Sequence, residues 1–85
     1  MTPEESKNFD ILFDLFTHEG WKLFQNELRV NHDALRYNLV DSAPDTFSVN
    51  AGYIKGLAYS LAFEDMARNE YRNRLEAEID SHADL

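Results

Sequence analysis

The chain has 85 residues, a formal net charge of −8 and no cysteine. The negative charge repels phosphate backbones, so we expect no direct binding of nucleic acid. No apolar run approaches the roughly 20 residues that a helix needs to cross a bilayer, so we expect no membrane partner. Because cysteine is missing, disulfides and thiolate–metal sites are excluded as sources of stability.

The composition predicts one all-α domain over residues 1–85. Hydrophobic residues make up 44% of the chain, which is too apolar for a disordered protein, and two prolines and three glycines leave few breaks between helices. A chain this short buries only about 60–65% of the surface that it exposes when unfolded. Small proteins without disulfides or metals often depend on oligomerisation for stability. The acidic N-terminal segment is unlike a signal peptide, so we expect an intracellular protein.

The first helix is predicted over residues 3–16. Thr2 suits the N-cap, Pro3 suits the first helical position, and Glu5 completes a capping box. Apolar residues then recur at spacings of three and four and form one stripe, which contains Phe9, Leu12, Phe13 and Phe16. A helix of this length is marginal in isolation, so it must pack against another element.

The second helix is predicted over residues 18–41, with Thr17 as its cap. One apolar stripe along it contains Trp21, Phe24, Leu28, His32, Leu35 and Leu39. A second stripe lies nearly opposite and contains Leu23, Val30 and Tyr37. A helix with two apolar stripes is usually covered on two sides. Either the other two helices or a second subunit could provide that cover.

The third helix is predicted to be long, over about residues 47–80, because residues 48–81 contain no proline. Pro44 places a loop at residues 42–46. Three residues remain as alternative caps for the helix: Asp45, Thr46 and Ser48. The short first helix and a long antiparallel hairpin then give a three-helix arrangement. The third helix extends beyond the second, and the first helix lies beside its C-terminal half.

The third helix also carries the candidate interface. Gly52, Gly56 and Ser60 fall four residues apart, and such a row lets another backbone approach closely. Tyrosine is favoured at protein interfaces, and a core of this size cannot hold every aromatic side chain. The predicted interface residues are Tyr53, Gly56, Tyr59, Ser60, Phe63 and Tyr71. The alternative is that Phe63 and Trp21 are core residues and that the tyrosines are merely half-buried.

No arrangement of residues indicates catalysis, and we predict no enzymatic activity and no catalytic, metal-binding or cofactor-binding residue. Three histidines are spaced too far apart to share a helical turn: His18, His32 and His82. Glu64 and Asp65 interrupt an apolar stripe, and Arg68 is placed to form an ion pair with either carboxylate. No glycine-rich phosphate loop or nucleophile motif is present.

Two segments, LFTHEGWKLFQNEL and GYIKGLAYSLAFEDM, contain the most distinctive spacing in the chain. The first segment has the pattern LF-x-x-x-GW followed by a leucine, which is formed by Leu15, Phe16, Gly20, Trp21 and Leu28. The second segment begins a helix with the pattern aromatic-x-x-Gly followed by a leucine, which is formed by Tyr53, Gly56 and Leu61. The pattern, within residues 12–66, resembles a group of short helical proteins encoded by tailed bacteriophages. The resemblance implies a phage origin, in the virion or the host cytoplasm, and transfers no site residue.

Two functions are therefore expected. The first is a small structural or assembly protein of a phage that contacts itself or a larger virion protein through its helices. The alternative is an inhibitor that covers a basic surface of a host protein with an acidic helical surface. The acid-rich ends of the chain favour this alternative; they contain Glu4, Glu5, Asp10, Asp14 and Glu19, and Glu76, Glu78, Asp80 and Asp84.

Overall fold

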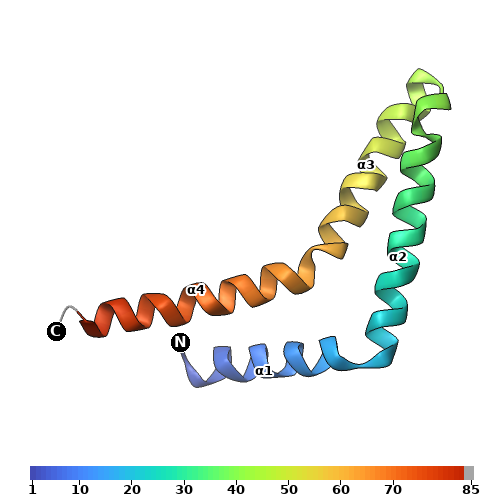
Figure 1. The fold of residues 1–85 in the computed structure, drawn as a ribbon. Coiled ribbons are helices and arrows are strands. Elements are labelled where there is room, and N and C mark those ends of the chain that lie inside the picture. The colour runs from blue at the N-terminus through green and yellow to red at the C-terminus, as the bar shows by residue number, and fades with distance from the viewer. Residues whose placement is uncertain (84–85) are drawn as a thin grey trace.

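The computed structural model describes residues 1–83, which contain only helices and the turns between them (Figure 1). The all-α prediction is therefore confirmed. In chain order the elements are α1 (Pro3–Thr17), α2 (Glu19–Asn38), the short 3₁₀ helix η1 (Leu39–Asp41), α3 (Pro44–Leu61) and α4 (Phe63–Ala83).

The start of α1 agrees with the sequence. The Thr2 hydroxyl accepts a hydrogen bond from the Glu5 amide at 3.1 Å, and the Glu5 carboxylate accepts one from the Thr2 amide at 3.3 Å. This reciprocal pair is the predicted capping box, and Pro3 occupies the first helical position. The cap fixes where α1 begins and therefore which of its residues share a face.

The start of α2 differs from the sequence prediction. Thr17 ends α1, and its hydroxyl donates to the Asp14 carbonyl at 2.7 Å. Because that hydroxyl already serves the last turn of α1, it does not cap α2. His18 takes the N-cap position with an extended backbone and no side-chain capping bond. The chain changes direction at this single residue.

The start of α3 also differs, because none of the three expected caps is used. Ala43 is the N-cap residue and makes no side-chain bond, while Pro44 takes the first helical position. The fixed φ of proline suits that position, and its missing N–H removes one donor that would otherwise need a cap. Asp45, Thr46 and Ser48 therefore lie inside the helix, which starts three residues earlier than predicted.

The predicted single helix over residues 47–80 is interrupted at Ala62, which separates α3 from α4. The Ala62 amide donates to the carbonyls of both Ala58 and Tyr59, so the last turn of α3 tightens. Two residues earlier, the Ser60 hydroxyl donates to the Gly56 carbonyl at 3.0 Å. Back-bonding of this kind at Gly/Ser pairs is a known cause of bent helices.

The break decides the shape of the molecule. The α1 helix lies beside α4 and α2 lies beside α3, so two antiparallel helix pairs form two arms that meet at an angle (Figure 1). We call the region where the turns at His18 and Ala62 meet the corner. The Cα radius of gyration is 18.1 Å, against about 12 Å for a compact chain of this length. The expected overshoot of the third helix is replaced by the packing of α4 along α1.

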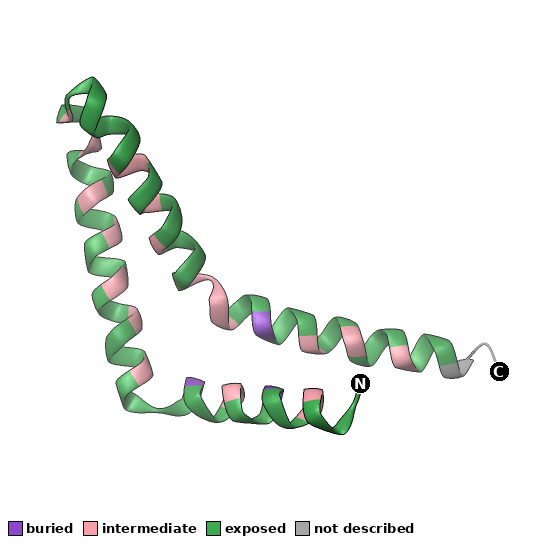
Figure 2. Ribbon diagram, turned by 180° about the vertical axis from the view of Figure 1, so that it is seen from behind, coloured by how far each residue is buried: buried purple, intermediate pink, exposed green. Residues whose placement is uncertain are grey.

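The molecule is one helix layer thick, with a shortest extent of 17 Å. Most domains enclose a hydrophobic core between two layers of secondary structure, and a single layer of helices cannot enclose such a core. Among residues 1–81, only Phe9, Phe16 and Ala67 are buried, and all three lie in the arm formed by α1 and α4 (Figure 2). The accessible surface is 6651 Å², against roughly 5,200 Å² for a compact monomer of this mass.

The extra surface is largely apolar. Within the described residues, fourteen large apolar side chains are exposed, from Ile11 in α1 to Ile79 in α4. The α2 helix shows the pattern most clearly. Its first stripe faces α3, apart from the exposed Phe24, whereas its second stripe, which includes Leu23 and Tyr37, stays uncovered. Intramolecular packing therefore covers one side of α2 and leaves the other to solvent.

Replacement of Phe16 by alanine should destabilise the fold by about 3 kcal/mol, because this ring is only 3% exposed and its loss leaves a cavity. Urea denaturation followed by far-UV circular dichroism measures the change. Leu23→Ala is the control, since that side chain is 63% exposed and its loss should change stability by less than about 0.5 kcal/mol. Equal effects of the two substitutions would contradict the described packing.

Candidate functional site

Aromatic rings from three helices meet at the corner. The Phe16 ring of α1 lies 5.1 Å from the Trp21 ring of α2 and 6.0 Å from the Phe63 ring of α4, measured between centroids. Tilted and edge-on arrangements at these distances are favourable beyond the area that they bury. Because the three residues come from helices that point in different directions, this cluster fixes the angle between the two arms.

A polar bond reinforces the cluster. The Trp21 indole N–H donates to the Glu64 carboxylate at 2.9 Å, and Arg68 Nε donates to the other oxygen of Glu64 at 3.3 Å. The Arg68 guanidinium also lies 5.3 Å from the centroid of the Phe13 ring. The sequence predicts the Glu64–Arg68 pair but not the bond from Trp21. A half-buried indole N–H needs a hydrogen-bond acceptor, and this requirement could have indicated that Trp21 bonds to a carboxylate such as Glu64.

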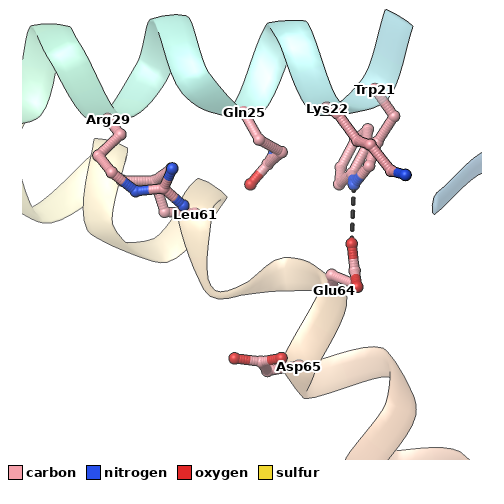
Figure 3. A pocket seen from close by; sticks show the side chains of 7 residues that line it. All are labelled: Trp21, Lys22, Gln25, Arg29, Leu61, Glu64 and Asp65. Carbon is pink, nitrogen blue, oxygen red and sulfur yellow. Dashed lines mark hydrogen bonds between the residues drawn. The ribbon is translucent and has the colours of Figure 1, made fainter. Parts of the chain in front are cut away.

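A pocket of about 300 Å³ lies next to this bond (Figure 3). Its charged lining is balanced, with Lys22 and Arg29 from α2 and Glu64 and Asp65 from α4. Glu64 is already engaged by two donors, so it is poorly placed to act as a general acid or base. The Gln25 side-chain nitrogen is buried at the same place and has no hydrogen-bond partner.

A second kind of surface runs along α3, on residues that lack charge. One shallow depression of about 460 Å³ is lined by Val49, Gly52, Tyr53, Gly56 and Leu57. A neighbouring one of about 240 Å³ is lined by Trp21, Phe24, Gln25, Leu28, Tyr59, Ser60 and Phe63. The α3 residues of the two sets follow one another at helical spacing, so they form one continuous surface. We call it the α3 groove.

The glycines of the α3 groove face open space. A Cβ atom built on Gly52 or Gly56 meets no other atom within 4 Å. These glycines are therefore not required by packing inside the molecule, although glycine in a helix interior costs about 0.5–1 kcal/mol relative to alanine. Their lack of a side chain lets the backbone of another helix approach α3.

The structure divides the six predicted interface residues. Five line the α3 groove: Tyr53, Gly56, Tyr59, Ser60 and Phe63. The sixth, Tyr71, lies between α4 and α1, with its ring 5.1 Å from that of Phe13. Phe63 also belongs to the corner cluster, and Trp21 contributes to both regions. The prediction missed Phe24 and Val49, both of which are exposed on the groove.

Charge is distributed unevenly between the arms. The α1 helix carries four acidic residues and one basic residue, and α4 carries six and three, whereas acids and bases balance within α2 and within α3. The amino group of Met1 forms an ion pair with Glu78, and Arg74 lies 3.4 Å from Glu5. The two acid-rich ends of the chain therefore come together in one arm. Asp84, which was counted among them, lies outside the described residues.

Arg74 holds these ends together. Its Nε donates to the Glu70 carboxylate at 2.8 Å, and this hydrogen bond raises the pKa of the guanidinium above its ordinary value, with Coulomb attraction from Glu70 and Glu5 acting in the same direction. The guanidinium also lies 5.4 Å from the Phe9 ring centroid. Arg74 therefore packs an aromatic core residue and joins α1 to α4.

Within residues 1–81, no group of three or more histidine and carboxylate side chains is close enough to hold a metal ion. Two histidines instead pair singly with neighbouring acids. His18 lies 3.2 Å from Asp14, and His32 lies 3.1 Å from Asp33. In the same part of the chain, no helix combines the length and apolarity that a bilayer span requires.

Comparison of the chain with protein-family models, with curated protein sequences and with solved structures found no match. The features of the molecule that bear on its function are therefore the corner, the α3 groove and the distribution of charge.

Trp21→Phe should destabilise the protein by about 1–2 kcal/mol, because it keeps a ring in the corner cluster but leaves a partly buried carboxylate oxygen of Glu64 without its donor. Urea denaturation followed by circular dichroism measures this loss. Tyr37→Phe removes a polar atom from a side chain that is 85% exposed, and it should leave stability unchanged. A Trp21→Phe variant as stable as the wild type would show that the bond does not help to fix the corner.

Proposed function

We propose that this chain is a small acidic helical protein that acts by binding other protein through its exposed apolar faces, above all through the α3 groove. The observation that carries the proposal is the uncovered apolar surface of a single helix layer. Soluble monomers rarely expose contiguous apolar patches of more than a few hundred Å², and larger ones mark sites of interaction. The absence of charge along the groove also matches the centre of typical interfaces.

The resemblance to short phage-encoded proteins directs this proposal towards a virion or assembly component. Such a protein would contact itself or a larger virion protein, either in the host cytoplasm during assembly or in the finished particle. This role needs no catalytic or cofactor-binding residue. It requires a rigid shape that presents a defined apolar surface, and the corner cluster supplies that rigidity.

The proposal predicts association at micromolar concentration. Size-exclusion chromatography with light scattering should give a mass above the 9.9 kDa of one chain, or the protein should be found by mass spectrometry in purified phage particles. Because the exposed surface is apolar, association should persist when the salt concentration is raised. A protein that is strictly monomeric and also missing from purified particles would contradict the proposal.

A second candidate function is inhibition of a host protein through the acidic arm formed by α1 and α4. The observation that favours it is the joining of the two acid-rich ends of the chain, for example by the Arg74–Glu5 pair. A cluster of negative charge can occupy a surface that normally binds nucleic acid, and it also accelerates encounter with a basic partner. The acidic surface of this arm is diluted by three arginines of α4, Arg68, Arg72 and Arg74, so we rank the function second.

If the acidic arm binds a host protein, replacing Asp10 and Asp80 together by asparagine should reduce capture of that protein from host lysate several-fold. Both residues are exposed. The control replaces Glu27 by glutamine and Asp41 by asparagine in the other arm, which changes the net charge equally and should leave capture intact. Equal capture by the two double variants, or capture that resists high salt, would contradict this function.

A further inference from the structure

We infer that the α3 groove is covered by a second copy of this chain, so that two α3 helices pack against each other around a two-fold axis close to Gly52 and Gly56. This inference rests on the proposed function and specifies its partner. Surface area, charge and the shape of the groove each support it.

The surface area matches what a stable dimer needs. The chain exposes about 1,400 Å² more than a compact monomer of its mass. A specific interface of ordinary size buries about 800 Å² on each partner. The excess is therefore large enough for one interface of this size, and a second copy packed on the uncharged α3 groove would leave the polar surface of the arms in water. It would also supply the second helix layer that one chain lacks.

The distribution of charge favours contact between two copies of the chain at the α3 groove and disfavours contact between their acidic arms. Two chains of net charge −8 repel each other, and the repulsion is strongest between the acidic arms. The α3 helix carries only Asp45 and Lys55 and has no net charge. Neither residue lines the groove. A two-fold contact along α3 thus brings two copies together where they do not oppose each other electrostatically.

The groove is self-complementary, as a two-fold interface requires. Tyr53 and Val49 project from it and are mostly exposed, while Gly52 and Gly56 leave open space beside them. Projecting side chains and positions without a side chain thus alternate along the same face of one helix. A second α3 helix can place its tyrosine over the glycines of the first, and the reverse contact follows by symmetry.

The test uses the three glycines, which all lie in helices and all have open space where a Cβ would stand. Gly56→Leu fills the groove without a clash inside the monomer, so the helix should remain at least as stable. Sedimentation velocity over a concentration series should show a dimer of the wild-type chain and at least a tenfold weaker dimer of Gly56→Leu. Gly20→Leu, in the first turn of α2 and outside the set of residues that line the groove, should dimerise like the wild type. Circular dichroism verifies that the wild type and both variants fold.

Cysteine cross-linking locates the contact, since the chain has no cysteine of its own. Under oxidising conditions Gly52→Cys or Gly56→Cys should form a disulfide-linked dimer far more completely than Gly20→Cys, because a disulfide needs Cα atoms within about 7 Å. A dimer that Gly56→Leu leaves intact and that cross-links no better at Gly52 or Gly56 than at Gly20 overturns the inference, although the proposed function survives through another face. A wild-type chain that stays monomeric overturns the inference as well. The proposed function then depends on the presence of the protein in purified particles.

Discussion

A layer of helices that is only one helix thick cannot enclose its own side chains, and this constraint governs the whole molecule. Each helix here has one close neighbour along most of its length, so each can bury one stripe and no more. The α2 helix carries two stripes, and α3 carries one face packed against α2 and one uncharged groove. The apolar residues beyond those that one neighbour covers are therefore left in water. These uncovered apolar residues are the basis of the proposed role in contact with other protein.

The corner makes this thin layer a defined shape. Without contacts between the arms, a chain with turns at His18 and Ala62 could adopt many angles. The rings of Phe16, Trp21 and Phe63 bring three helices into one cluster, and Glu64 accepts hydrogen bonds from α2 and from its own helix. Trp21 and Phe63 also line one end of the α3 groove. The contacts that fix the angle therefore also fix the position of the surface proposed to bind a partner.

Local signals in the sequence were sufficient where a helix end depends on its own first turn. Thr2, Pro3 and Glu5 predict the start of α1 because all the atoms of a capping box lie within four residues. Local reasoning failed at Thr17, because the hydroxyl that could cap α2 bonds to the preceding turn instead. It failed again at Ala62. Residues of good helix propensity surround that break, and its direction depends on rings from α1 and α2 that are distant in sequence.

In the candidate interface, too, some features follow from local sequence and others depend on contacts between helices that are distant in sequence. The four-residue spacing of Gly52, Gly56 and Ser60 is visible in the sequence, and the three residues lie along the α3 groove. Tyr71 has the same chemistry as Tyr53 but lies against Phe9 and Phe13, because α4 turns back along α1. Which tyrosines are covered depends on that turn. The groove residues contributed by α2, such as Phe24, belong to the site only because α2 and α3 lie side by side.

The separation of charge between the arms also gives the molecule a direction. Most of the negative charge of the molecule lies in the α1–α4 arm, and the α2–α3 arm is nearly neutral. The electrostatic potential around the molecule is therefore most negative at one end. A cationic body at a distance would be drawn to the α1–α4 end first. If several copies associated through their neutral α2–α3 arms, the acidic α1–α4 arms would lie at the periphery of the assembly and apart from one another.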